Sequence, residues 1–146
     1  MIILDTNVVF EAVKINRNIA VVKWLDNQTA ETLYLTAISL SELLIGVEIL
    51  PPGKRKEGLS AGLADLLSRL FGARVLSFDR EAAASYSVLV GKARAAGKAV
   101  SVPDGQIGAI ATVHGFTVAT RDTIPFAALG VPVINSWSDH KLTSRL

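Results

Sequence analysis

The sequence begins with the stretch MIILDTNVVF, residues 1–10, in which four apolar residues lead directly into Asp5, Thr6 and Asn7. A short, wholly apolar run of this kind is typical of a buried strand in a parallel sheet. Asp5 is then predicted to lie at the end of that strand. Because burial of an unpartnered carboxylate is costly, Asp5 needs a solvated pocket, a cation or a proton.

Length and composition indicate a single domain. The chain has 146 residues, half of them hydrophobic, with a mean hydropathy of +0.41. Residues 1–146 are therefore expected to form one domain with a substantial core and a looser tail after about residue 138. No apolar run approaches the ~18 residues of a membrane span, and no signal peptide is indicated, so we expect a cytoplasmic protein without a membrane partner.

Cysteine and charge limit the chemistry. The chain contains no cysteine, which excludes disulfide scaffolds, thiolate metal sites and cysteine nucleophiles. A net charge of +2 and a pI of about 9.1 are compatible with a nucleic-acid partner.

Strands and helices are predicted to alternate along the chain. Short apolar runs predict strands at 1–4, 32–36, 74–78, 116–120 and 131–135. A helix is expected to follow the first strand and run through 11–14, and further helices are expected at 19–26, 39–50, 59–71, 80–96, 103–114 and 124–130, with a charged loop at 53–58. This alternation predicts an α/β fold: a central parallel sheet of about five strands with helices on both faces.

Four acidic residues are predicted to lie at or near the carboxyl ends of these strands, where ligands bind in open parallel sheets. They are Asp5, Glu42, Asp104 and Asp122. Each has a structural alternative: Glu42 follows Ser39 at capping-box spacing, and an acid at a helix start also favours the helix dipole. Convergence of all four is the stronger interpretation, and carboxylates so close repel one another unless a cation is present or protons are shared.

The type of cation follows from the ligands. Carboxylates with nearby hydroxyl and amide oxygens, and no thiolate, suit hard Mg²⁺ or Mn²⁺. Zinc is not expected, because the two histidines, His114 and His140, are isolated in the sequence. A hard divalent ion in an acidic pocket can activate water and neutralise a phosphodiester.

Four segments carry a family resemblance when taken as an ordered set: MIILDTNVV, AISLSELLIGV, DGQIGAIATVHGFTVATRD and VINSW, at residues 1–9, 37–47, 104–122 and 133–137. Together they resemble the PIN-domain ribonucleases, and among these the VapC-type toxins of bacterial toxin–antitoxin pairs, FitB-like branch. The resemblance covers almost the whole chain.

The resemblance implies a PIN-like fold and a Mg²⁺- or Mn²⁺-dependent endoribonuclease that hydrolyses RNA phosphodiester bonds and is neutralised by a cognate antitoxin. It assigns the catalytic and metal-binding roles to the same four acids, and it places Asn7 and Thr120 where they shape the pocket. It further implies a homodimer and a small antitoxin, often with a DNA-binding segment.

One predicted helix independently suggests a partner. After Ser39, apolar residues occupy two opposite sides of the helix, with one stripe at Leu40, Leu43, Leu44 and Val47 and the other at Ile45 and Ile49. A helix that is apolar on two sides is either fully buried or shared with a partner, and we favour the partner.

Two other functions stay open at this point. The LDTN motif is similar to that of phosphatases and receiver domains, which would make Asp5 an aspartyl-phosphate nucleophile, although Asn7 stands where such phosphatases carry a second Asp. A catalytically silent PIN-like binding module is the other. The P-loop and dinucleotide-binding motifs are both absent. Candidate nucleic-acid contacts are Arg121, Lys54, Arg55 and Lys56, with weaker candidates at Arg17, Lys92, Arg94 and Lys98.

Overall fold

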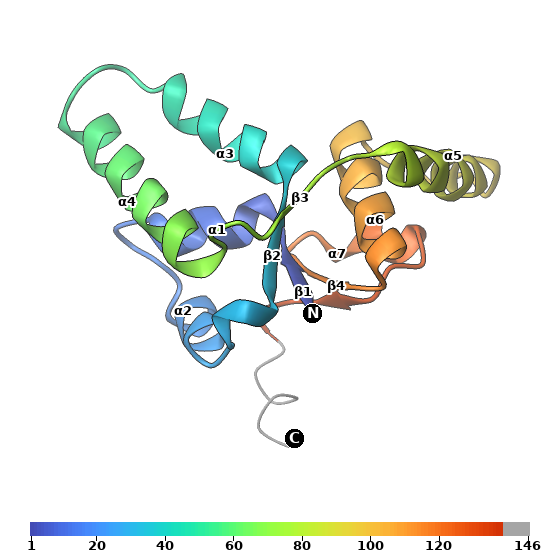
Figure 1. The fold of residues 1–146 in the computed structure, drawn as a ribbon, viewed down its shortest axis with the longest axis horizontal. Helices are drawn as coiled ribbons and strands as arrows, with labels where there is room; N and C mark the ends of the chain where they lie inside the picture. The colour runs from blue at the N-terminus through green and yellow to red at the C-terminus, as the bar shows by residue number, and fades with distance from the viewer. Residues whose placement is uncertain (139–146) are drawn as a thin grey trace.

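The structure is a computed structural model that describes residues 1–138. Five parallel strands form one sheet in the order β3-β2-β1-β4-β5 (Figure 1). The strands are β1 Ile2–Leu4, β2 Leu33–Thr36, β3 Val75–Leu76, β4 Thr117–Ala119 and β5 Val133–Ile134. The predicted parallel sheet of about five strands is confirmed. The predicted loose tail lies outside the described residues.

Seven α-helices and one 3-10 helix connect the strands. They are α1 Thr6–Val13, α2 Ile19–Asp26, η1 Ala30–Thr32, α3 Ala37–Glu48, α4 Lys54–Leu70, α5 Arg80–Ala95, α6 Val102–His114 and α7 Thr123–Ala128. Local signals predicted several of their ends. The Asn18 side chain accepts from Ala20 N–H at 2.8 Å at the start of α2, and Asp79 caps α5 in the same way.

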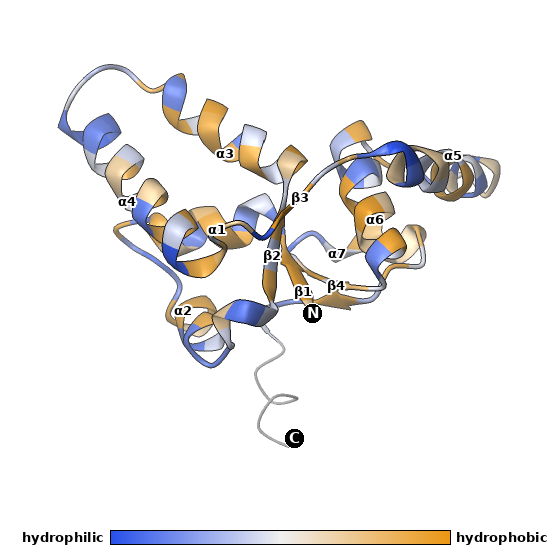
Figure 2. Ribbon diagram, viewed as in Figure 1, coloured by the Kyte–Doolittle hydropathy of each residue, from blue (hydrophilic) through white to orange (hydrophobic). Residues whose placement is uncertain are grey.

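Helices cover both faces of the sheet because neighbouring strand residues point to opposite sides. Leu4 packs into a core with residues of α1, α2, α3 and α4. Its neighbour Ile3 packs into a second core with residues of α5, α6 and α7. In Figure 2 the central strands are hydrophobic, whereas the start of α4 is hydrophilic. The α/β architecture with helices on both faces is therefore confirmed.

Two local predictions were wrong. The expected loop at 53–58 is mostly the first turn of α4, which begins at Lys54. Glu57 lies in that turn, where a negative charge favours the helix dipole, and Lys56 Nζ donates to the carbonyl of Glu48 at 2.9 Å. These contacts extend the helix into a strongly charged segment.

The start of α3 also differs from the prediction. Thr36 is its N-cap, since the Thr36 hydroxyl accepts from Ser39 N–H at 3.0 Å. Ser39 is thus a residue of the first turn and Glu42 lies in the second. The capping-box interpretation of Glu42 is therefore wrong, and its side chain is free for another contact.

Helix α6 packs tightly against α5, and this contact positions the start of α6. A Cβ atom at Gly105 would lie 2.7 Å from the ring of Tyr86 and 2.9 Å from Val90. Only a residue without a side chain lets the two helices approach so closely. The first turn of α6, which carries Asp104, is thereby held beside the sheet.

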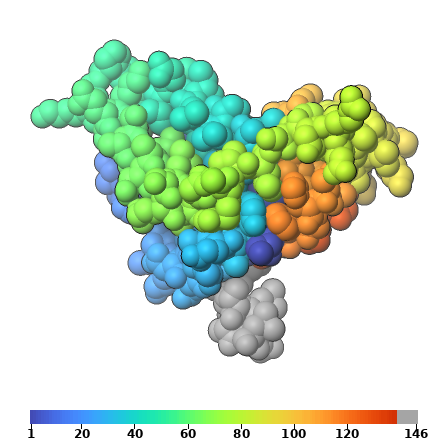
Figure 3. Space-filling view, in the orientation of Figure 1, coloured from blue at the N-terminus to red at the C-terminus, as the bar shows by residue number. Residues whose placement is uncertain are grey.

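The helices on the two faces form two lobes. Helices α3 and α4 project as an arm on one side of the sheet, with α5 and α6 on the other (Figure 1). The space-filling view shows an indented outline between these lobes (Figure 3). Strand β2 leads into α3 at this indentation, and α6 begins there. Within residues 1–138, no helix is both long and apolar enough to cross a membrane.

Candidate active site

Asp5 lies directly after β1 and is almost fully buried, with 5% of its surface exposed. Its main-chain N–H donates to the carbonyl of Ala119 on β4 at 2.9 Å. Both carboxylate oxygens are engaged: Oδ1 accepts from Thr6 N–H and Oδ2 from the Thr120 hydroxyl, each at 2.8 Å. Asp5 therefore caps α1 and is fixed by the ends of two neighbouring strands.

Asn7 and Thr120 connect the two strand ends. Asn7 Nδ2 donates to Thr120 Oγ1 at 3.3 Å and lies 3.5 Å from Asp5 Oδ2. Asn7 Oδ1 accepts from Arg121 N–H at 3.2 Å, and Thr120 Oγ1 accepts from Asp122 N–H at 3.0 Å. This network brings the residues expected to shape the pocket into direct contact with Asp5.

Glu42 faces the same end of the sheet from α3. The Thr6 hydroxyl donates to its Oε1 at 2.9 Å. Thr6 therefore touches Asp5 through its main chain and Glu42 through its side chain. We did not single out Thr6 from the sequence, although its position next to Asp5 was a usable signal.

Asp104 and Asp122 lie on helix starts and are more accessible. Asp104 is half-buried in the first turn of α6, where its N–H donates to the N-cap Ser101 at 3.2 Å. Asp122 is exposed and occupies the N-cap position of α7, but it makes no side-chain capping bond within residues 1–138. Neither carboxylate is therefore the side-chain cap of its helix.

The four acids affect one another electrostatically. Burial raises the pKa of Asp5 from 3.8 to about 6; hydrogen bonds from Thr120 and Thr6 oppose the rise, and the charges of Asp104 and Glu42 add to it. Burial also raises the pKa of Asp104, against a hydrogen bond from Ser101 and with a further contribution from the Asp122 charge. The charges of Glu42 and Asp104 thus reach Asp5, and the charge of Asp122 reaches Asp104.

The donor set fits a hard divalent cation. The ligands at these positions are carboxylate, hydroxyl or amide oxygens, and burial makes the ionised Asp5 carboxylate unfavourable, which its raised pKa reflects. Within the part of the chain that the structure describes, however, no three His, Asp or Glu side chains are arranged so that they could hold one ion. Binding would therefore require side-chain movement.

The predicted nucleic-acid contacts divide into two groups. Arg121 lies beside Asn7 and Asp122 at the rim of the acidic pocket. Lys54, Arg55 and Lys56 instead begin α4, at the end of the α3–α4 arm away from the strand ends (Figure 1). The structure therefore brings only Arg121 to the acids.

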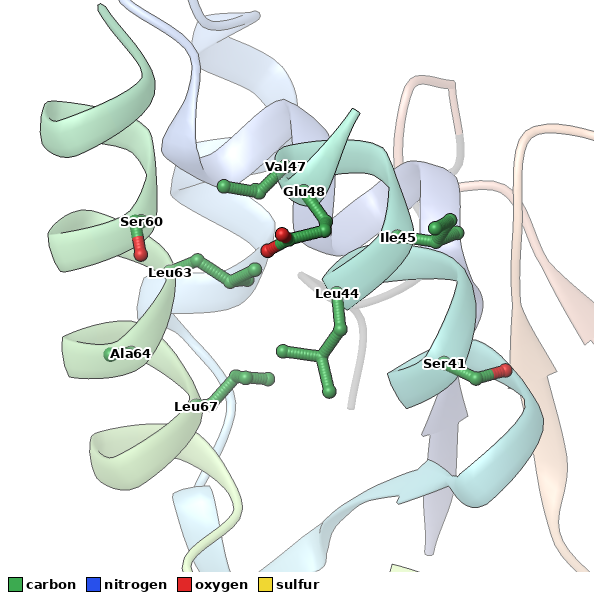
Figure 4. Close-up of a pocket in the computed structure, with 9 residues that line it drawn as sticks. All are labelled: Ser41, Leu44, Ile45, Val47, Glu48, Ser60, Leu63, Ala64 and Leu67. Carbon is green, nitrogen blue, oxygen red and sulfur yellow. The ribbon is translucent and has the colours of Figure 1, made fainter. Parts of the chain in front are cut away.

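An apolar groove lies between α3 and α4, away from the acids. It has a volume of about 630 Å³. In Figure 4, Leu44 of α3 and Leu63 and Leu67 of α4 point into it, and Ile45 of α3 also lines it. Leu44, Ile45 and Ile49 are 53%, 55% and 74% exposed. Helix α3 thus has the unburied apolar surface that its sequence predicted.

The fold is that of a PIN domain, and the PIN-domain family matches residues 2–131. The chain belongs to this family. Three relatives are similar over almost their whole length. Plasmid stability protein StbB of Pseudomonas syringae pv. tomato is 49% identical, over 94% of this chain and 99% of the relative. VapC ribonuclease Y4jK of Sinorhizobium fredii is 45% identical, over 94% and 98%. Toxin FitB of Neisseria gonorrhoeae is 44% identical, over 95% and 100%.

Solved structures agree with these relatives. The crystal structure of FitAcB from Neisseria gonorrhoeae matches with a TM-score of 0.89 at 43% identity, covering 94% of this chain and 99% of that chain. A structure of FitAB bound to a DNA fragment matches with the same TM-score at 42% identity, covering 94% and 96%. The resemblance stated from the sequence motifs is confirmed.

Proposed function

We propose that residues 1–146 form a single PIN-like domain that acts as a cytoplasmic, metal-dependent endoribonuclease and as the toxin of a toxin–antitoxin pair. The observation that carries the proposal is the buried Asp5 carboxylate, which has a raised pKa and lies within the electrostatic reach of Asp104 and Glu42. Membership of the PIN family and similarity to a VapC ribonuclease and a toxin support it.

Asp5, Glu42, Asp104 and Asp122 would hold Mg²⁺ or Mn²⁺. When bound, such an ion lowers the pKa of a water molecule and neutralises charge on a phosphodiester. Asp5 is the fixed ligand because three hydrogen-bond donors orient its carboxylate. The ion would thus bind against a rigid strand end rather than a mobile loop.

The chain's own residues would orient the reactants. Thr6 holds Glu42 toward Asp5, which leaves the other carboxylate oxygen of Glu42 able to accept a proton from, or position, a water molecule. Asp122 could play the same role from the exposed side of the pocket. Asn7 and Thr120 keep the two strand ends together and so fix the distance between Asp5 and Asp122.

Membership of the PIN family disfavours the phosphotransfer alternative. In addition, Asn7 stands where such phosphatases carry a second Asp. The silent binding module stays open, and the cleavage experiment below distinguishes it from the nuclease.

The α3–α4 groove supports a small antitoxin protein as partner. Its apolar lining and the exposed Leu44 would be covered by an apolar segment of that partner. The similarity to FitAB, solved bound to DNA, supports a partner that itself binds DNA. Ile49, at the end of α3, is 74% exposed and does not line this groove, so it offers separate apolar surface for a homodimer.

RNA cleavage tests the proposed chemistry. The purified, partner-free protein should cut RNA when Mg²⁺ or Mn²⁺ is present and should stop in EDTA. Asp5→Asn should reduce cleavage by orders of magnitude. Asp65→Asn is the matched control, because Asp65 is exposed on α4 and pairs with Arg69. Cleavage that persists in EDTA would exclude the metal mechanism, and binding without cleavage of any RNA would favour the binding module.

Co-expression tests the partner. The product of the neighbouring gene should co-purify with this protein and relieve its effect on growth. Leu44→Asp should weaken that complex without altering cleavage by the free protein, because Leu44 lies outside the acidic pocket. A monomer whose growth effect the neighbour does not relieve would contradict the toxin–antitoxin assignment.

A further inference from the structure

Arg121 and Trp137 form a stacked pair at the rim of the acidic pocket. The Arg121 guanidinium carbon lies over the Trp137 ring, 5.3 Å from its centroid. The two residues come from the loops after β4 and β5, which are neighbours in the sheet. A cation over the face of a tryptophan ring is attracted to it.

Both members of the pair are fixed by their main chains. Arg121 N–H donates to Asn7 Oδ1 at 3.2 Å, which ties it to the network around Asp5. Trp137 N–H donates to Asn135 Oδ1 at 3.0 Å. The Trp137 ring is half-buried against the core that contains Leu4 and Ala119. The pair is therefore positioned by the same strand ends that position the acids.

Arg121 is exposed and takes part in neither of the two ion pairs formed within residues 1–138. The guanidinium lies over the tryptophan ring, so its donor edge and its outer face stay available to a ligand. A planar cation over an aromatic ring is suited to a ligand that has both an aromatic ring and a negative charge.

We propose that Arg121 and Trp137 form a nucleotide platform on which one unpaired base of single-stranded RNA stacks, while the guanidinium donates to the adjacent phosphate. The inference rests on the proposed ribonuclease function and names the form of RNA that the site takes. An unpaired base can lie against an arginine plane, whereas a base within a duplex cannot. The cation also offsets the repulsion between the acids and the RNA backbone.

Binding in EDTA tests the platform without relying on cleavage. A labelled single-stranded oligoribonucleotide is titrated with wild type, Arg121→Gln, Arg121→Lys and Trp137→Phe, with fluorescence anisotropy as the readout. Arg121→Gln should weaken binding about 5- to 100-fold, the range of one stacked base. It should also lower the slope of log K against log salt by about 0.7, the value for one phosphate contact on a single strand.

The other variants separate stacking from charge. Arg121→Lys keeps the positive charge but loses the planar guanidinium. It should therefore keep the wild-type slope of log K against log salt and still bind the oligoribonucleotide more weakly than wild type. Trp137→Phe keeps a smaller ring, so its affinity for the oligoribonucleotide should lie between those of wild type and Arg121→Gln. Arg69→Gln, which removes an exposed arginine from α4, should bind like wild type. A duplex of the same sequence should compete poorly.

Several outcomes would overturn the platform. These are Arg121→Gln binding as tightly as wild type, Arg121→Lys matching wild type, a duplex competing equally well, or no RNA binding at all. Cleavage kinetics in Mn²⁺ distinguish this failure from failure of the proposed function. If wild type cleaves and Arg121→Gln leaves KM unchanged, the platform is wrong and the nuclease stands. If wild type binds through Arg121 but never cleaves, the nuclease is wrong and the platform stands.

Discussion

Removing the charge of Asp5 should change how the stability of the metal-free protein depends on pH. Asp5 has a pKa of about 6 in the folded protein against 3.8 for an ordinary Asp. An acid whose folded pKa is raised binds its proton more tightly in the folded state than in the unfolded state. Its ionisation therefore opposes folding, and stability is lost as pH rises from the unfolded pKa through the folded pKa.

The size of the effect follows from this difference in pKa. Each pKa unit corresponds to ~1.4 kcal/mol, so ionised Asp5 should cost about 3 kcal/mol of unfolding free energy. Because the side chain is only 5% exposed, solvent screening should reduce this little. The cost should be nearly absent below about pH 3, should develop mostly between pH 4 and 6, and should be complete above about pH 7. The Asp5→Asn side chain cannot ionise, so this variant should not show the pH-dependent cost.

Urea unfolding in EDTA, followed through the buried Trp24, measures the effect. The unfolding free energy of wild type minus that of Asp5→Asn should fall by about 3 kcal/mol between pH 3 and pH 7.5. Altered hydrogen bonds to Thr6 and Thr120 add an offset that does not depend on pH. Asp65→Asn controls for loss of one exposed carboxylate. A difference that stays flat, or that rises with pH, would refute a raised pKa at Asp5.

Three further changes test the rest of the pocket and its support. Asp104→Asn should raise the melting temperature in EDTA at neutral pH, because the pKa of Asp104 is raised. Added Mn²⁺ should then stabilise the variant less than wild type, and an equal rise in melting temperature for both would argue that Asp104 is not a ligand. Gly105→Ala should lower the free energy of unfolding in urea by about 1–3 kcal/mol through overpacking. Gly91→Ala should be neutral or stabilising by ~0.5–1 kcal/mol, because no described atom lies within 4 Å of its added Cβ. Equal effects would contradict tight α5–α6 packing. Thr6→Val should cost only ~1 kcal/mol of unfolding free energy but should lower the rate of RNA cleavage strongly, because it releases Glu42. Unchanged cleavage would remove Glu42 from the mechanism.

The fold could be predicted from the sequence because its signals are local. Short apolar runs identified all five strands, and capping residues such as Asn18 and Asp79 identified helix starts. The parallel arrangement then placed the strand ends at one edge. This is why Asp5 and Asp122, which are far apart in the chain, could be predicted to approach the same pocket.

What the sequence could not provide are contacts between distant elements. The bond from Thr6 to Glu42 joins residues 36 positions apart, and the local pattern around Glu42 resembled a capping box instead. The stacking of Arg121 on Trp137 depends on the order β4-β5 in the sheet and has no local signal. The start of α4 was missed because a dense run of charges resembles a loop when the preceding helix is not considered.

The pocket has one fixed part and one adjustable part, and this division relates the proposed chemistry to its inhibition. Asp5, Thr120 and Asn7 are locked by mutual hydrogen bonds at the strand ends, so folding alone sets their geometry. Asp104 and Asp122 are both more exposed than Asp5. In the metal-free protein burial raises the pKa of Asp5, and the charges of Asp104 and Glu42 add to the rise, so the ionised carboxylate is unfavourable in the folded state. A divalent cation would stabilise that charge, and so would a cationic side chain of a partner placed beside Asp5. Neutralisation by an antitoxin can therefore draw on the same buried charge that recruits the metal, which is why we expect an arginine or lysine of the partner at this point.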